Sequence, residues 1–174
     1  MVLDEGLVTS RPIEISMGLL QLEPLSGLEN LSRLELSGVI DNPSIIVNTN
    51  GLPQNLTRLT LVDSALMDDP MPVLQKLHNL RSLYLNDRSY MGSSMVCSKG
   101  GFPQLLVLKM SFLFNLKELI LEEQALQKIV ELEIVNCRSL KAAMVNETQN
   151  LYACKVPGSI TCLYQRIEWC WTKI

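Results

Sequence analysis

A short leucine pattern recurs along the chain at nearly constant spacing, and this repeat constrains the fold more than any other feature. Five nine-residue segments carry an apolar residue at their second, fifth and seventh positions: NLSRLELSG from Asn30, NLTRLTLVD from Asn55, NLRSLYLND from Asn79, QLLVLKMSF from Gln104 and KIVELEIVN from Lys128. The central leucines, Leu34, Leu59, Leu83, Leu108 and Leu132, are separated by 25, 24, 25 and 24 residues. So even a step predicts a repeat architecture.

The spacing inside each copy predicts a β-strand. The fifth and seventh positions are two residues apart, so they lie on one side of a strand, and the second position enters the core from the preceding chain. The fourth, sixth and eighth positions then face solvent. One such unit cannot bury its own apolar face. We therefore expect the units to stack, which pairs the strands in parallel over a continuous leucine core.

The chain between strands must return to the start of the next one, and it carries a second apolar set. In one repeat this set includes Leu66, Met67, Met71, Leu74 and Leu77. There the stretch DDPMPVLQKL places acids and prolines before an apolar run, which predicts a short helical turn.

One copy of the pattern is out of step. NLKELILEE begins at Asn115, 11 residues after one copy and 13 before the next. We interpret it as a short extended piece on the convex or side surface. The alternative is two repeats shortened below the usual length of about 20–29 residues.

The pattern resembles the leucine-rich repeat, L-x-x-L-x-L-x-x-N/C-x-L, and its best copy is LQKIVELEIVNCRSL, with Cys137 at the turn position. The resemblance implies an α/β fold: a curved leucine-rich-repeat solenoid with parallel strands on the concave face and short helical or irregular return segments. We divide the chain into a partial N-terminal repeat at 1–27, repeats at 28–141 with a period of about 24–25 residues, and a non-repeat tail at 142–174. Ile13 and Ile15 are the candidate strand of the partial repeat.

The tail at 142–174 has no repeat spacing, and two interpretations of it stay open. It is a capping segment over the last repeat, or sequence that was not selected for folding. Because neither terminal repeat has an obvious polar cap, we expect the isolated chain to be marginally stable and its strand edges to invite association.

Longer phrases resemble one class of repeat protein. LPQNLTRLTLVDSALMDDPMPVLQKLHNLRSLYL, YMGSSMVCSKGGFPQLLVLKM and LKELILEEQAL are similar to the C-terminal repeat region of plant intracellular disease-resistance proteins of the coiled-coil, nucleotide-binding, leucine-rich-repeat class. The resemblance implies a fragment of a cytoplasmic immune receptor that senses effectors or holds the receptor in an off state. The implied partners are a pathogen effector, a guarded host protein, or the nucleotide-binding domain of the same receptor family.

Two alternatives to this function stay open. One is a substrate-recruiting leucine-rich-repeat protein of a ubiquitin ligase, and the other is a non-functional truncated remnant of a resistance gene. An extracellular receptor is disfavoured because the sequence shows no G-x-I-P after its strands and no paired capping cysteines.

Several classes of site lack the residues they need. No G-x-x-x-x-G-K-[ST] loop is present, so we expect no nucleotide cofactor. His78 is the single histidine, which leaves little for a hydrolase triad, and we expect no enzyme activity. Asp68 and Asp69 precede Pro70 at the predicted helix start, where acids suit the helix dipole better than a metal site. The five cysteines show no C-x-x-C spacing, so we expect reduced thiols.

Charge and hydropathy exclude two further partners. The net charge of −3 gives no basic footprint for nucleic acid. No stretch of about 20 apolar residues is present, so no transmembrane segment is expected. Asn30 and Asn55 begin N-x-S/T triplets, but Asn79 occupies the same repeat position. We therefore interpret these triplets as by-products of the repeat and not as glycosylation sites.

The exposed strand positions predict a binding face on the concave side. Stacking places Glu35, Thr60, Tyr84, Lys109 and Glu133 in one column. The candidate binding residues are Arg33, Glu35, Arg58, Thr60, Tyr84, Asn86, Lys109, Glu131 and Glu133. A tyrosine beside a lysine, flanked by acids, fits a protein-contact patch, because aromatic residues anchor interfaces. The alternative is a face that only keeps the chain soluble.

Overall fold

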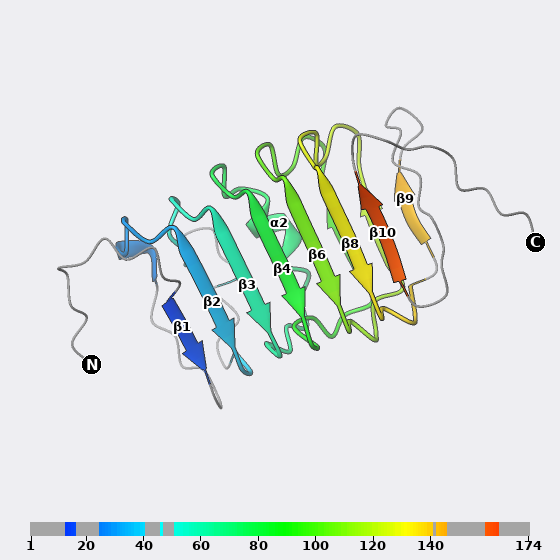
Figure 1. The fold of residues 1–174 in the computed structure, drawn as a ribbon, viewed down its shortest axis with the longest axis horizontal. Coiled ribbons are helices and arrows are strands. Elements are labelled where there is room, and N and C mark those ends of the chain that lie inside the picture. Colours follow the sequence, from blue (N-terminus) through cyan, green and yellow to red (C-terminus); the bar gives the residue numbers. More distant parts are fainter. Residues whose placement is uncertain are drawn as a thin grey trace, which may run out of the picture.

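The computed structural model describes residues 13–16, 25–40, 46, 51–140, 142–145 and 159–163, and the fold below refers to these residues. Its strands are β1 (Ile13–Ser16), β2 (Arg33–Ser37), β3 (Arg58–Val62), β4 (Ser82–Asn86), β5 (Ser94–Cys97), β6 (Val107–Ser111), β7 (Glu118–Leu121), β8 (Glu131–Val135), β9 (Ala142–Val145) and β10 (Ser159–Leu163). The helical segments are the 3₁₀ turn η1 (Leu25–Gly27) and the helix α2 (Met71–Leu74). Figure 1 shows the strands side by side along a solenoid.

The predicted parallel stack is confirmed. The main sheet has the order β1-β2-β3-β4-β6-β8-β10, and the five strands from β2 to β8 are those of the five repeat copies. Their register aligns the central leucines, Leu34, Leu59, Leu83, Leu108 and Leu132. The strand β1 pairs in parallel with β2, with Ile13 opposite Leu34 and Ile15 opposite Leu36. The chain is therefore a leucine-rich-repeat solenoid.

The repeat leucines form one continuous core. All fifth and seventh positions, from Leu34 to Ile134, are buried, and so are the second positions Leu56, Leu80, Leu105 and Ile129. Leu31, the second position of the first copy, is partly buried against the same core. Removal of this apolar surface from water is the main driving force for stacking the coils.

The coils are also joined by a recurring backbone contact at the start of each main strand. The Ser32 carbonyl accepts hydrogen bonds from the amides of Thr57 and Arg58, at 2.8 and 3.1 Å. The same arrangement recurs at the carbonyls of Thr57, Arg81 and Leu106. It satisfies backbone groups that would otherwise be left unpaired where the chain enters the sheet.

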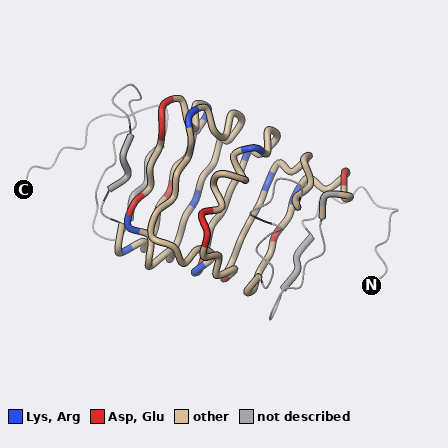
Figure 2. The backbone as a smooth tube through the Cα atoms, turned by 180° about the vertical axis from the view of Figure 1, so that it is seen from behind, with Lys and Arg blue, Asp and Glu red and all other residues tan. Residues whose placement is uncertain are grey.

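A second sheet lies on the far side of the coils, in the order β5-β7-β9 (Figures 1 and 2). The out-of-step copy forms β7, as predicted for a short extended piece away from the main sheet. Its side chains Leu119 and Leu121 join Met95 and Cys97 of β5 in the core. The sequence reasoning missed β5, so the far side contains a sheet where only an isolated extended piece was expected.

The predicted helical turn is α2, which buries Met71 and Leu74. Asp69 precedes the helix, and its carboxylate accepts hydrogen bonds both from the helix start and from β5. One carboxylate oxygen accepts a hydrogen bond from the Met71 amide at 2.9 Å and the other from the Val96 amide at 2.8 Å. Gln75 similarly accepts from the Ser98 amide at 2.9 Å. Side chains flanking α2 thus cover the edge of β5 that has no neighbouring strand.

The tail contributes two described strands. The strand β9 continues the far sheet in parallel, whereas β10 pairs antiparallel with β8, with Thr161 opposite Glu133. Most of 1–27 and of 142–174 lies outside the described residues, so the proposed domain division stays a prediction. The described helices are also far too short to cross a membrane.

Candidate binding surface

The outward side chains of β2, β3, β4, β6 and β8 form one surface, which we call the broad face. The structure places all nine predicted binding residues on it. The strand register aligns Glu35, Thr60, Tyr84, Lys109 and Glu133 in one column, as the repeat spacing predicts. These side chains stand on paired strands, so the backbone holds their spacing nearly constant across the sheet.

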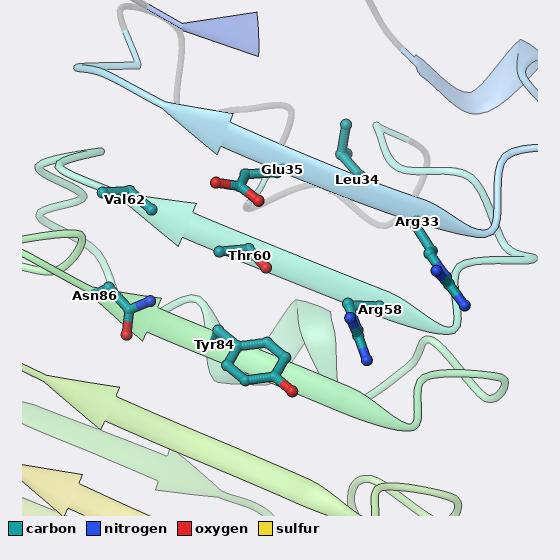
Figure 3. A pocket seen from close by; sticks show the side chains of 8 residues that line it. All are labelled: Arg33, Leu34, Glu35, Arg58, Thr60, Val62, Tyr84 and Asn86. Atoms are coloured by element: carbon teal, nitrogen blue, oxygen red, sulfur yellow. The ribbon is translucent and has the colours of Figure 1, made fainter. Parts of the chain in front are cut away.

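An open hollow of about 420 Å³ lies over the first three of these strands (Figure 3). It is lined by Arg33, Leu34, Glu35, Arg58, Thr60, Val62, Tyr84 and Asn86. Six of these are predicted binding residues. Val62, a further outward strand position, adds apolar surface to the hollow, whereas Leu34 is 1% exposed and belongs to the core.

The two ends of the hollow differ in chemistry, because one is cationic and the other is uncharged. Figure 3 shows the Arg33 and Arg58 side chains directed toward one end, and Val62 and Asn86 at the other. The Arg58 guanidinium carbon lies 5.6 Å from the centre of the Tyr84 ring. Such a cation–π contact favours one placement of the arginine over the ring. The tyrosine and the arginine therefore present a joint aromatic and cationic surface.

Lys109 lies in the other half of the broad face and is engaged by two acids of β8. Its Nζ atom lies 2.7 Å from Glu131 and 2.9 Å from Glu133. The hydrogen bonds that Lys109 donates to Glu131 and then to Glu133 raise the pKa of Lys109 above its usual value. Tyr84 and Lys109 are register partners, as predicted, but Tyr84 contacts Arg58 on β3, whereas Lys109 contacts the acids on β8. The predicted patch thus consists of two neighbouring groups. One is formed by β3 and β4, and the other by β6 and β8.

The carboxyl ends of the strands carry contacts that the sequence reasoning missed. Ser111 donates a hydrogen bond from its Oγ to the Asn86 side-chain oxygen at 3.0 Å. Beyond it Phe112 and Phe114 are exposed by 38% and 42% of their surface. Their rings meet edge to face, with centroids 6.1 Å apart. The available signal was the ninth position of the repeat, where Phe112 replaces the small or polar residues of the other four copies.

Elsewhere the described residues show little that fits catalysis or metal binding. No group of three or more His, Cys, Asp or Glu side chains converges on one point in these ranges. His78 is exposed and lines a second open hollow with Asn79 and Arg81. Burial raises the pKa of the Cys97 thiol, with a smaller contribution from Asp69, and burial also raises the pKa of Cys137. Buried thiols of this kind are protonated at neutral pH and are poor nucleophiles.

Charged residues of both signs are spread along the coils instead of gathering by sign (Figure 2). In the described part the ion pairs outside the broad face join Arg88 to Asp63 at 3.0 Å and Lys99 to Glu123 at 2.7 Å. The surface of the described residues therefore offers no extended field of one sign, and the broad face is distinguished by its aromatic and paired groups.

Comparison with curated proteins finds relatives among plant disease resistance proteins. Probable disease resistance RPP8-like protein 2 of Arabidopsis thaliana is 46% identical over 89 residues, which cover 51% of this chain and 10% of the relative. Disease resistance protein RPP8 of the same plant is 39% identical over 114 residues, covering 66% and 13%. Probable disease resistance protein RF9, also from Arabidopsis thaliana, is 44% identical over 89 residues, covering 51% and 8%.

The chain thus spans about a tenth of the length of the relatives it matches. No protein-family model matches the chain. No solved structure matches it significantly.

Proposed function

We propose, from the premise that this chain is related to plant disease resistance proteins, that it is a recognition and regulatory repeat region of a plant immune receptor. In this proposal the broad face binds a protein and the chain itself catalyses nothing. The protein is a pathogen effector or guarded host protein, or the nucleotide-binding domain of the receptor family. The site of action is the cytoplasm, where buried free thiols such as Cys97 and Cys137 are compatible with the reducing environment.

The observation that carries the proposal is the arrangement of Tyr84 and its neighbours on the broad face. Tyr84 projects from a central strand beside Arg58, and both line the hollow. Tyrosine and arginine are enriched among the residues that dominate binding energy at protein interfaces. Because both are attached to paired strands, little conformational freedom is lost when a partner covers them.

The regulatory part of the proposal predicts contact with the remainder of a disease resistance protein. Disease resistance protein RPP8 with its matching segment deleted is a suitable probe, because the deletion leaves the position of this chain vacant. Co-expression of the two in leaf tissue, followed by co-immunoprecipitation, measures whether the 174-residue chain associates in trans. We expect the wild-type chain to bind, and the double variant Tyr84→Ala and Lys109→Ala to bind at least fivefold less.

The matched control is Lys99→Ala. Lys99 also pairs with a glutamate, Glu123, but it follows β5 on the far side of the coils. We expect this variant to bind as the wild type does. Equal binding by the Tyr84 and Lys109 double variant, with folding intact by circular dichroism, would remove the broad face from the proposal. A wild-type chain that fails to bind the deleted protein would remove the regulatory function.

A further inference from the structure

A column of left-handed residues follows the main strands at their carboxyl ends. Gly38, Asp63, Asp87, Phe112 and Asn136 all have positive φ, from 46° to 124°. The amides of the first four donate hydrogen bonds to carbonyls of the next coil, for example Phe112 to the Val135 carbonyl at 3.0 Å. Glycine, aspartate and asparagine tolerate this conformation, whereas a bulky residue there is a genuine outlier. Phe112, with φ of 56°, is the outlier of the column.

Packing does not compensate for the strain at Phe112 as it does at two buried positions of the chain. Phe102 and Leu126 also have positive φ, at 56° and 55°, but each is only 1% exposed and belongs to the core. Their burial offsets the backbone cost. Phe112 keeps 38% of its surface exposed, so much of its ring contributes nothing to the core. Strain that folding does not require points to a role for the side chain.

The surroundings of Phe112 make it an extension of the broad face. It follows Ser111, whose hydroxyl is hydrogen-bonded to Asn86, and Asn86 lines the hollow in Figure 3. Phe114 supports the Phe112 ring edge to face. Arg88, whose amide bonds the Phe112 carbonyl, directs its guanidinium to Asp63. This cation is therefore engaged in an ion pair with Asp63, and the exposed aromatic pair offers an apolar contact surface.

We propose that Phe112 is an aromatic anchor of the partner-binding surface, and that it receives an aliphatic or proline side chain of the protein bound on the broad face. This inference rests on the proposed function and deepens it by assigning the apolar contact. The partner accordingly carries an apolar side chain next to polar groups that reach Asn86 and Ser111.

The test separates binding from stability. Phe112→Asn places in this coil the residue that the next coil has at Asn136, so the left-handed backbone is kept with less strain. We expect its unfolding temperature to be equal to or up to about 4 °C above that of the wild type. In the same co-immunoprecipitation with the deleted RPP8, we expect binding to fall at least fivefold. Phe112→Trp keeps an aromatic anchor and should retain binding within twofold.

Asp87→Asn is the matched control, because it changes the same column one coil earlier and should alter neither measurement. Phe112→Asn that binds within twofold of wild type would overturn the inference, and so would a loss of binding accompanied by a lower unfolding temperature. If the Tyr84 and Lys109 double variant loses binding while Phe112→Asn does not, only this inference fails. A wild-type chain that does not bind the deleted RPP8 removes the regulatory function and the inference together.

Discussion

Asparagine side chains at the coil entries bind the preceding coil, which explains why the motif begins with Asn. The Nδ2 atom of Asn55 donates to the Glu29 carbonyl at 2.8 Å, and that of Asn79 to the Gln54 carbonyl at 3.2 Å. Asn115, in the out-of-step copy, donates to the Met91 carbonyl at 2.9 Å. The Asn55 nitrogen that a glycan would modify is therefore already used between coils. Sequence comparison alone identified the position as part of the repeat, but not this contact.

Replacement of Asn115 by Ala should destabilise the chain. The variant leaves the Met91 carbonyl without this donor, and a typical intramolecular hydrogen bond contributes about 0.5–1.5 kcal/mol to the free energy of unfolding. Urea unfolding followed by circular dichroism measures the change. Gln127→Ala, at an exposed position ahead of β8, is the control and should change the free energy by less than about 0.5 kcal/mol. Equal effects of the two substitutions would contradict a structural role for Asn115.

Cys97 makes stability depend on pH in the alkaline range. Its thiol is fully buried, and this burial raises its pKa above the ordinary value of 9.0. As pH rises past 9.0, the unfolded chain releases the thiol proton while the folded chain keeps it, so stability falls. Between pH 9 and 10 this contribution is about 1 kcal/mol, since one pKa unit corresponds to about 1.4 kcal/mol.

The measurement compares the wild type with Cys97→Ala, because other groups also titrate in this range. The variant is less stable at neutral pH, where it leaves a cavity. We expect the difference in unfolding free energy between the two proteins to shrink by about 1 kcal/mol from pH 9 to pH 10. A difference that stays constant over this range would show that the thiol ionises equally in the folded and unfolded chains.

At the scale of elements, the chain contains two interleaved repeat series, and the sequence reasoning recognised one. The recognised series has leucine at its core positions, so spacing alone predicted β2, β3, β4, β6, β8 and their register. The second series is MGSSMVC from Met91, NLKELIL from Asn115 and SLKAAMV from Ser139, at steps of 24 residues. It forms β5, β7 and β9, in register. Only its middle copy has the full leucine pattern, which is why β5 was missed.

Gly92 is the reason that the first copy of the second series departs from the leucine pattern. It occupies the position where NLKELIL has Leu116, so this coil lacks the second-position leucine. A Cβ atom on Gly92 would overlap the ring of Tyr90. Tyr90 is 4% exposed, and its hydroxyl donates to the Ser94 carbonyl at 2.6 Å. The tyrosine ring thus fills core volume that a leucine fills in the next coil, which a pattern of spacings does not reveal.

Gly92→Ala should therefore destabilise the chain by about 1–3 kcal/mol, the usual cost of inserting a group into a filled core. The overlap should be relieved when the ring is removed, so Gly92→Ala should cost less in a Tyr90→Ala background. Urea unfolding of the wild type, the two single variants and the double variant gives the coupling energy. Additive effects would mean that the ring of Tyr90 does not set the requirement for glycine.

At the scale of the whole molecule, stability depends on the ends of the array. Each coil contacts only its neighbours, so an end coil exposes core and an unpaired strand edge unless something covers it. The sequence shows no obvious polar cap at either end, and it left open whether the tail caps the last repeat. In the structure β1 lies beside β2, and β10 lies antiparallel beside β8. An antiparallel strand stops the array, because the next coil would have to pair in parallel at the same edge.

The capping interpretation of the tail is tested by truncation. A chain that ends at Val145 keeps β9 but lacks β10, whereas a chain that ends at Leu163 keeps both and serves as the control. Without β10 the edge of β8 is unpaired, and exposed strand edges promote association between chains. We expect the shorter chain to unfold at least about 4 °C lower and to self-associate in sedimentation velocity as its concentration rises. If it remains a monomer with the unfolding temperature of the longer chain, β10 does not act as a cap. The tail would then fit the other interpretation, of sequence not selected for folding.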